Sequence, residues 1–96
     1  MYATIDRYAS TTGSVDILAE AGHRLGTQLS RASGFVAAVS VLAGPDELLT
    51  IRLFQDEPSL EAARQVVAHW AAEHRPVVGN CSTELGSGEV VAQKGL

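Results

Sequence analysis

Hydrophobic and polar positions follow two different spacings along the chain. A spacing of two residues, or a short β-branched apolar run, predicts four strands, over residues Tyr2–Tyr8, Phe35–Leu42, Leu48–Phe54 and Thr83–Ala92. A spacing of three and four residues predicts two helices, over Ser14–Ala32 and Pro58–His74. The elements therefore follow the order strand, helix, strand, strand, helix, strand.

This order is typical of the ferredoxin-like α+β fold, a βαββαβ arrangement with one antiparallel four-stranded sheet and two helices on one face. No stretch has the composition of a linker, and no segment repeats. We therefore expect one domain over residues 1–96.

The first predicted helix carries a continuous apolar stripe. Its members are Val15, Leu18, Gly22, Leu25, Leu29 and Ala32. Ser14 is expected to cap the amino end and Gly34 to take a left-handed conformation after the carboxyl end. His23 falls on the polar face, where we expect a solvated residue without a ligand.

Two glycines in this helix need an explanation. Gly22 and Gly26 lie one turn apart, near or on the stripe, and each costs about 1 kcal/mol of helix stability relative to alanine. They could let the helix pack tightly on the sheet, or they could leave room for a ligand beneath it. The sequence favours packing but does not separate the two.

The central hairpin is apolar on both faces. Its turn surrounds Pro45, whose ring presets a negative φ. One face of the first arm consists of Phe35, Ala37, Val39 and Val41, and the other of Val36, Ala38, Ser40 and Leu42. The second arm likewise places Leu49, Ile51 and Leu53 opposite Leu48, Thr50, Arg52 and Phe54. Since two helices cover only one face, we expect a homodimer whose sheets pack face to face.

Charge and cysteine usage exclude several classes of partner. The chain has seven Lys and Arg against eleven Asp and Glu, and no basic run, so we expect no nucleic-acid partner. No apolar run approaches the length needed to cross a membrane, and none resembles a secretory signal. Cys81 is the single cysteine, so it has no internal disulfide partner. No histidine lies near it at the spacing of a metal site. These features predict a cytoplasmic protein with no metal.

The chemically suggestive residues gather around the second helix and the central strands. Trp70 and His74 lie one turn apart on its apolar stripe, with Leu60, Ala63 and Val67 before them, while His69 projects to one side. Either residue could be structural, since a tryptophan at a helix end often fills the core and a histidine there favours the helix dipole. Arg52 is a charge in an apolar strand: it should face solvent, pair with Asp6 or Glu84, or meet an anionic ligand. Asp6 shares a strand face with Tyr8, but the pattern does not show on which face of the sheet the two side chains lie.

Other chemistries of this topology lack their residues. The chain has no glycine-rich phosphate loop and no nucleophile elbow. RNA binding would require aromatic residues on the central strands, and the strand Leu48–Phe54 offers only Phe54, at its end. Acylphosphatase-like catalysis would require an arginine in a glycine-bearing first loop and a partner asparagine, and the one asparagine is Asn80.

The chain resembles the dimeric α+β barrel proteins of the antibiotic biosynthesis monooxygenase type over nearly its whole length. The resemblance rests on the opening strand Tyr2–Tyr8, on Ser33-Gly34-Phe35, and on Ala68-His69-Trp70 followed by Ala71. Ser33 stands where the family has a recurrent proline. The resemblance implies a homodimer with a ligand cleft between the helices and the sheet of each subunit.

Relatives of this type include cofactor-independent oxygenases of polycyclic phenols and enzymes that degrade haem. The haem-degrading branch has an asparagine on its first strand, where this chain has Thr4 and Asp6, and its tryptophan and histidine lie further apart than Trp70 and His74. Haem degradation is therefore not expected.

The resulting hypothesis is a small monooxygenase that acts without a cofactor on a planar aromatic of the polyketide or quinone type. His74, or less favourably Asp6, would remove a proton from the substrate; Arg52 or Tyr8 would stabilise the enolate, and Trp70 would hold the ring plane. Two alternatives stay open. One is a dimeric barrel that binds a small molecule or acts as an interaction module without catalysis. The other is an isomerase or decarboxylase that uses the same cleft without oxygen.

Overall fold

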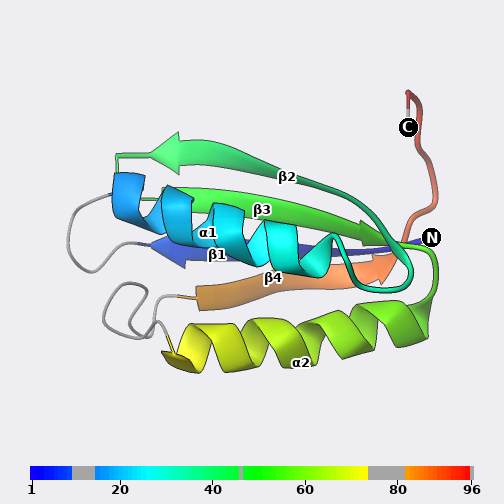
Figure 1. Cartoon of the computed structure of the whole chain (residues 1–96). Helices are drawn as coiled ribbons and strands as arrows, with labels where there is room; N and C mark the ends of the chain where they lie inside the picture. Colours follow the sequence, from blue (N-terminus) through cyan, green and yellow to red (C-terminus); the bar gives the residue numbers. More distant parts are fainter. Residues whose placement is uncertain (10–14, 46, 74–81, 96) are drawn as a thin grey trace.

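The computed structural model describes residues 1–9, 15–45, 47–73 and 82–95. Its elements are β1 (Tyr2–Ala9), α1 (Val15–Leu29), β2 (Phe35–Gly44), β3 (Glu47–Phe54), α2 (Glu57–Glu73) and β4 (Ser82–Glu89). The strands form one antiparallel sheet in the order β2-β3-β1-β4. Both helices lie on the same face of that sheet (Figure 1). The predicted ferredoxin-like α+β fold is confirmed.

The helices are held by apolar side chains at the predicted spacing. Leu25 and Leu29 of α1 and Leu60, Ala63 and Trp70 of α2 are buried. They meet Tyr8, Leu48 and Phe54 from the central strands in one cluster. The core therefore lies between the helices and the sheet, and burial of these stripes fixes which helix faces look inward.

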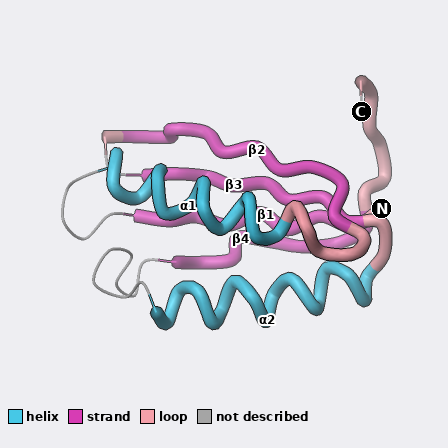
Figure 2. Tube along the Cα trace, viewed as in Figure 1, coloured by secondary structure: helices cyan, strands magenta, loops and turns pink. Residues whose placement is uncertain are grey.

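Three predicted boundaries need correction. The helix α1 ends at Leu29 instead of Ala32, because the next amides bond to carbonyls three residues back, as in a turn: Arg31 to Gln28 and Ala32 to Leu29. Figure 2 shows the loop that follows and leads to the start of β2. The strand β4 ends at Glu89, not Ala92, after which the amide of Val90 bonds to the carbonyl of Met1. The strand β2, in contrast, continues beyond Leu42 to Gly44.

Gly34 has the predicted left-handed conformation, with a φ of 83°. A side chain there would also collide with that of Ser59 at the start of α2. The glycine is therefore required twice, by its backbone conformation and by the close approach of α2.

The first arm of the hairpin differs from the predicted pattern. A register shift between Phe35 and Ala37 places Phe35 opposite Phe54, and the two rings make an edge-to-face contact with centroids 6.1 Å apart. Phe35 thus joins the helix-side core, and the prediction that it shares a face with Ala37 is wrong. A bulge inserts one extra residue, and this moves a side chain to the other face.

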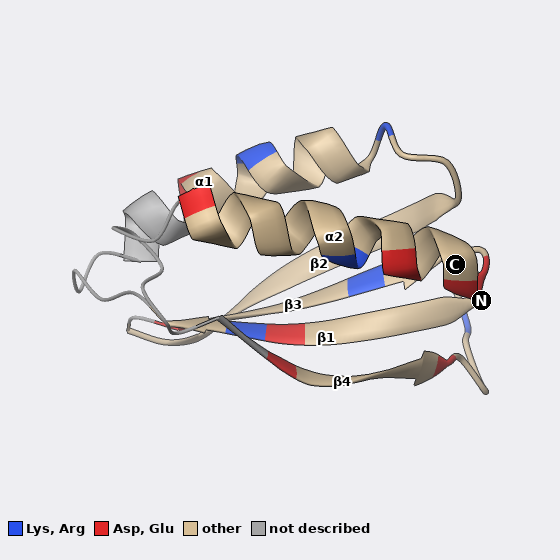
Figure 3. Ribbon diagram, turned by 90° about the horizontal axis from the view of Figure 1, so that it is seen from below, with Lys and Arg blue, Asp and Glu red and all other residues tan. Residues whose placement is uncertain are grey.

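No described helix lies on the second face of the sheet (Figure 3). Ile5, Val39 and Val41 are 40%, 54% and 49% exposed in the single chain, so this face is apolar and accessible. Among the described residues, no helix is long and apolar enough to cross a membrane.

Candidate functional site

A buried polar patch occupies the centre of the sheet on the face that the helices cover. Thr4 and Asp6 of β1 and Thr50 and Arg52 of β3 are all buried, although each is polar or charged. Thr4 lies opposite Arg52, and Asp6 lies opposite Thr50. The sequence left open which face these residues share, and the structure assigns them to the helix side.

Arg52 joins Asp6 and Tyr8 into what we call the Arg52 cluster. Its Nη1 donates a hydrogen bond to Oδ2 of Asp6 at 2.6 Å, and its Nη2 donates to the hydroxyl of Tyr8 at 3.1 Å. The guanidinium carbon lies 5.8 Å from the centre of the Tyr8 ring. The predicted pairing of Arg52 with Asp6 is therefore confirmed, and the side chain does not face solvent. Since Arg52 is only 3% exposed, this pairing compensates a charge that is almost fully removed from water.

The pKa of Asp6 is raised above its ordinary value of 3.8. Burial is the largest cause, because it disfavours the charged carboxylate, and the positive charge of Arg52 does not fully offset it. Glu84 lies directly opposite Asp6 on β4 and raises the pKa further. Asp6 therefore accepts a proton more readily than an exposed aspartate does.

Trp70 packs against the Arg52 cluster from α2. Its ring meets that of Tyr8 edge to face, with the centroids 6.1 Å apart and the planes at 90°. The tryptophan is buried in the core, as the structural interpretation of this residue predicts. It also lines a cavity, as the ligand-binding interpretation requires.

The large cavity, of about 540 Å³, lies between α1 and the sheet. Tyr8, Arg52 and Trp70 contribute to its walls, so three of the five residues singled out from the sequence meet at one space. Thr50 and Ser40 add hydroxyl groups, whose oxygens are 2.9 Å apart. Apolar walls with a few convergent polar groups are the usual character of a small-molecule site.

Gly22 and Gly26 form part of the roof of the large cavity. A Cβ atom added at either position would meet no atom within 4 Å outside its own helix. Tight packing of α1 on the sheet therefore does not explain these glycines. Their missing side chains leave space open beneath the helix, in agreement with the second of the two interpretations.

Sequence reasoning assigned no functional role to several polar residues that line the large cavity. His23, Ser40 and Thr50 are among them. His23 is exposed, as predicted, yet it also lies on the cavity wall. The sequence could have indicated this place, because His23 lies three residues before Gly26 and residues three apart share a helix face.

A second, small cavity of about 350 Å³ lies between α2 and the sheet. Asp6, Phe54, Leu60 and Glu84 belong to its lining. Arg52 lines both cavities, whereas Asp6 lines only the small one. Arg52 therefore lies between the two spaces, and its carboxylate partner Asp6 lies at the small cavity.

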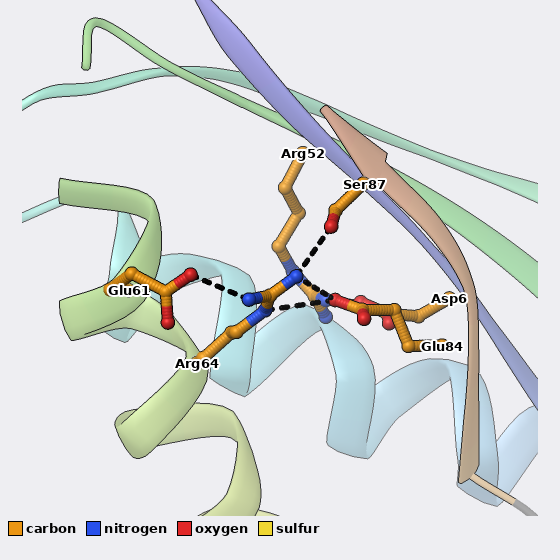
Figure 4. Close-up of polar contacts among 6 residues, drawn as sticks. All are labelled: Asp6, Arg52, Glu61, Arg64, Glu84 and Ser87. Atoms are coloured by element: carbon orange, nitrogen blue, oxygen red, sulfur yellow. Dashed lines mark hydrogen bonds and ion pairs between the residues drawn. The ribbon is translucent and has the colours of Figure 1, made fainter. Parts of the chain in front are cut away.

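Arg64 links α2 to the edge strand β4 at the small cavity (Figure 4). Its Nε donates to Oε1 of Glu84 at 2.9 Å, and its other nitrogens donate to Ser87 and to Glu61 of its own helix. Glu84 and Ser87 are three residues apart and would face opposite sides of a regular strand. A register shift between their pairing partners brings both to the helix side, with Leu85 as the extra residue.

The remaining site candidates give a mixed result. His74 lies outside the described residues, so its predicted role as a base is untested. Asn80 and Cys81 also lie outside them. His69 is exposed, with its Nε2 2.9 Å from Oε1 of Glu73. Within the described ranges, no three His, Cys, Asp or Glu side chains are grouped so as to hold a metal ion.

Comparisons with known proteins show a shared fold at low sequence identity. No protein-family model and no curated protein sequence matches the chain. The NE2512 protein of unknown function from Nitrosomonas europaea has a TM-score of 0.82 and 20% identity, over 97% of this chain and 91% of that one. A second protein of this organism, provisionally described as an antibiotic biosynthesis monooxygenase, has a TM-score of 0.79 and 13% identity, over 98% and 93%.

SnoaB of Streptomyces nogalater, described as a cofactor-independent oxygenase, has a TM-score of 0.71 and 18% identity, over 99% of this chain and 95% of that one. The chain therefore has the ferredoxin-like α+β fold of several solved proteins that are named antibiotic biosynthesis monooxygenases.

Proposed function

We propose that this protein binds a planar aromatic substrate of the polyketide or quinone type in the large cavity and oxygenates it without a cofactor. The observation that carries the proposal is the open space beneath Gly22 and Gly26, with Tyr8, Arg52 and Trp70 on its walls. The shared fold with SnoaB supports it, since that protein is described as a cofactor-independent oxygenase. Within a fold that hosts many functions, the site carries more weight than the likeness.

The cavity suits a polycyclic phenol in size and in chemistry. Its volume of about 540 Å³ is typical of sites that enclose a small molecule. The indole of Trp70 and the ring of Tyr8 offer aromatic surface for a ring system. Arg52 presents the positive charge that a phenolate or enolate oxygen would require, and hydrogen bonds to charged groups are the stronger ones.

The proposed reaction needs molecular oxygen as its oxidant. A base removes a proton from a substrate carbon that is conjugated through the aromatic rings to a carbonyl, and Arg52 or Tyr8 stabilises the enolate that results. The enolate carbon transfers electrons to oxygen and forms a C–O bond, which gives a hydroperoxide after protonation. Loss of water from the hydroperoxide leaves a new carbonyl, so one oxygen atom enters the product and the other leaves as water.

His74 is the proposed base, and Asp6 is the alternative. Asp6 lines the small cavity and holds Arg52 with its carboxylate, so acting as a base would require the substrate to reach past the guanidinium. His23 is a third candidate, because it is the histidine on the wall of the large cavity among the described residues.

The proposal is tested by oxygen uptake with 1,8-dihydroxyanthrone, corrected for spontaneous oxidation. We expect catalysed uptake by the wild type and a decrease of about 100-fold in kcat/KM for Arg52→Lys, because a fixed donor to the developing enolate is lost. Arg24→Lys is the matched control, since Arg24 is an exposed arginine that pairs with Glu20 on the helix surface. Uptake no faster than in buffer would contradict an oxygenase of such phenols.

A non-catalytic barrel that binds a small molecule is the second candidate. The observation that favours it is that the guanidinium of Arg52 already has two partners, Asp6 and Tyr8, as expected of a structural ion pair. Quenching of Trp70 fluorescence by an anthraquinone, without oxygen uptake from the anthrone, would identify this case.

We also propose that two copies pair through the uncovered sheet face. Apolar side chains on neighbouring strands, among them Ile5, Val39 and Val41, form this face and are about half exposed in one chain. Monomeric soluble proteins rarely expose a large contiguous apolar patch, so a patch of this kind favours an interface. The second copy is the occupant, because a sheet face of the same shape and polarity can cover it symmetrically.

A further inference from the structure

The partition between the two cavities suggests a link between ligand binding and protonation. Arg52 lines both cavities and carries one positive charge, while Asp6 lies in the small cavity and carries the compensating negative charge. The side chains of Arg52 and Asp6 are 4% and 12% exposed, so water screens neither charge effectively.

An anionic ligand in the large cavity would meet Arg52 from the side opposite Asp6. The site would then hold two negative charges and one positive charge away from water. Where two acidic groups share one buried site, the proton affinity of one of them rises strongly. Arg52, which lines both cavities, is thus the cation that the two anions would have to share.

The other groups around Asp6 determine where the proton goes. Glu84 of β4 faces Asp6 and is itself bound by Arg64 of α2, so its negative charge already has a partner. Tyr8 of β1 uses its hydroxyl to accept from Arg52. Asp6 is the buried acid whose cation the ligand would take, and burial already raises its pKa.

We propose that binding of an anionic aromatic ligand in the large cavity is coupled to uptake of one proton by Asp6. This inference rests on the proposed function, because it takes the ligand of that same cavity to be an enolate, a phenolate or a carboxylate. Asp6 is then a positioning residue: as a carboxylate it holds Arg52 in the empty site, and as a neutral acid it leaves the charge of Arg52 to the ligand. A neutral ligand of the same shape would cause no uptake.

The test compares two ligands that do not react with oxygen, anthraquinone-2-carboxylate and its carboxamide. Titration calorimetry near pH 7 in PIPES and in Tris, which differ in ionisation enthalpy, gives the number of protons taken up. We expect about one proton with the carboxylate and none with the carboxamide. The carboxyl ¹³C resonance of Asp6 in the wild type should move to its protonated position only with the carboxylate.

Variants identify the acceptor of the proton. Asp6→Asn should abolish the uptake and bind the carboxylate more tightly, because Arg52 is no longer shared. Glu47→Gln is the control, since Glu47 is an ion-paired carboxylate bound to Arg7 outside both cavities, and it should retain the uptake. His23→Gln should also retain it.

The outcomes separate this inference from the function on which it rests. Binding of the carboxylate without proton uptake, or with an Asp6 resonance that stays ionised, overturns the inference and leaves the proposed site intact. Loss of the uptake in His23→Gln overturns it as well. If neither anthraquinone binds, the proposed ligand site is wrong and the inference falls with it.

Discussion

At the scale of single residues, the site depends on a buried ion pair whose two members have different tasks. Arg52 satisfies Asp6 and Tyr8 at 2.6 and 3.1 Å, and no buried polar side-chain atom in the described ranges lacks a partner. Removing both charges from water costs free energy that their attraction does not fully return. The raised pKa of Asp6 reflects this balance, since burial outweighs the cation beside it.

This balance predicts how Asp6 contributes to stability at different pH values. The folded pKa of Asp6 lies above the unfolded value near 3.8, so the folded chain holds this proton more tightly. Its contribution is therefore complete below the unfolded pKa and is lost as the pH rises through the folded pKa. We expect the free energy of unfolding of the wild type, relative to Asp6→Asn, to decrease as the pH rises from about 4 through the folded pKa of Asp6.

Urea unfolding of both proteins across this range measures the difference, and other titrating groups cancel because they are common to both. A difference that instead increases with pH would mean that attraction to Arg52 outweighs burial, contrary to the raised pKa of Asp6.

At the scale of elements, two glycines in and after α1 serve different purposes. Gly26 borders open space, while Gly34 has a φ of 83° and lies against Ser59. We expect Gly26→Ala to increase the free energy of unfolding by about 0.5–1 kcal/mol, because alanine favours the helix and its methyl group meets no atom. Gly34→Ala should decrease it by more than about 1 kcal/mol through strain and collision.

Substitutions at Gly26 separate an effect on stability from an effect on ligand binding. Gly26→Leu should weaken binding of anthraquinone-2-carboxylate, because the side chain points into the large cavity, while Gly26→Ala should have a smaller effect. Chemical unfolding and fluorescence titration give the two quantities. If Gly26→Ala destabilised the chain as much as Gly34→Ala, α1 would pack on the sheet more closely than the structure shows.

Two register shifts also act at this scale. One turns Phe35 toward the helices, and the other brings both Glu84 and Ser87 within reach of Arg64. A spacing of two residues in the sequence cannot reveal either, because one inserted residue reverses the face of every residue beyond it. The stripe of α2, by contrast, was predicted at Leu60, Ala63 and Trp70, since a helix has no comparable freedom of register.

At the scale of the whole molecule, the uncovered sheet face predicts the assembly. Val39 is 54% exposed and lies in β2 opposite Ile51 on this face. We expect the wild type to sediment as a dimer at micromolar concentration and Val39→Lys to sediment as a monomer, because an unpaired buried charge would disrupt the interface.

Ala62→Lys is the control, because Ala62 is exposed on α2, a helix on the opposite face of the sheet. It should remain dimeric, and both variants should keep the circular dichroism of the wild type. A monomeric wild type at this concentration would contradict the proposed dimer.

The sequence by itself determined the order of the elements and the two alternating faces of β3. It also determined the inward positions Leu25 and Leu29 of α1 and Leu60, Ala63 and Trp70 of α2. These follow from spacing alone, because apolar side chains must leave water whatever the details of packing. The candidate cluster was partly visible as well, since a buried arginine requires a partner and Asp6 was among the few available.

The tertiary structure alone decided which face of the sheet carries Asp6, Tyr8 and Arg52, and that Arg52 separates two cavities. It also decided that Gly22 and Gly26 border space instead of tight packing. The physical reason is that a cavity, a strand register and the distance between two side chains depend on how separate elements meet. The periodicity of one segment contains no information about what lies across from it.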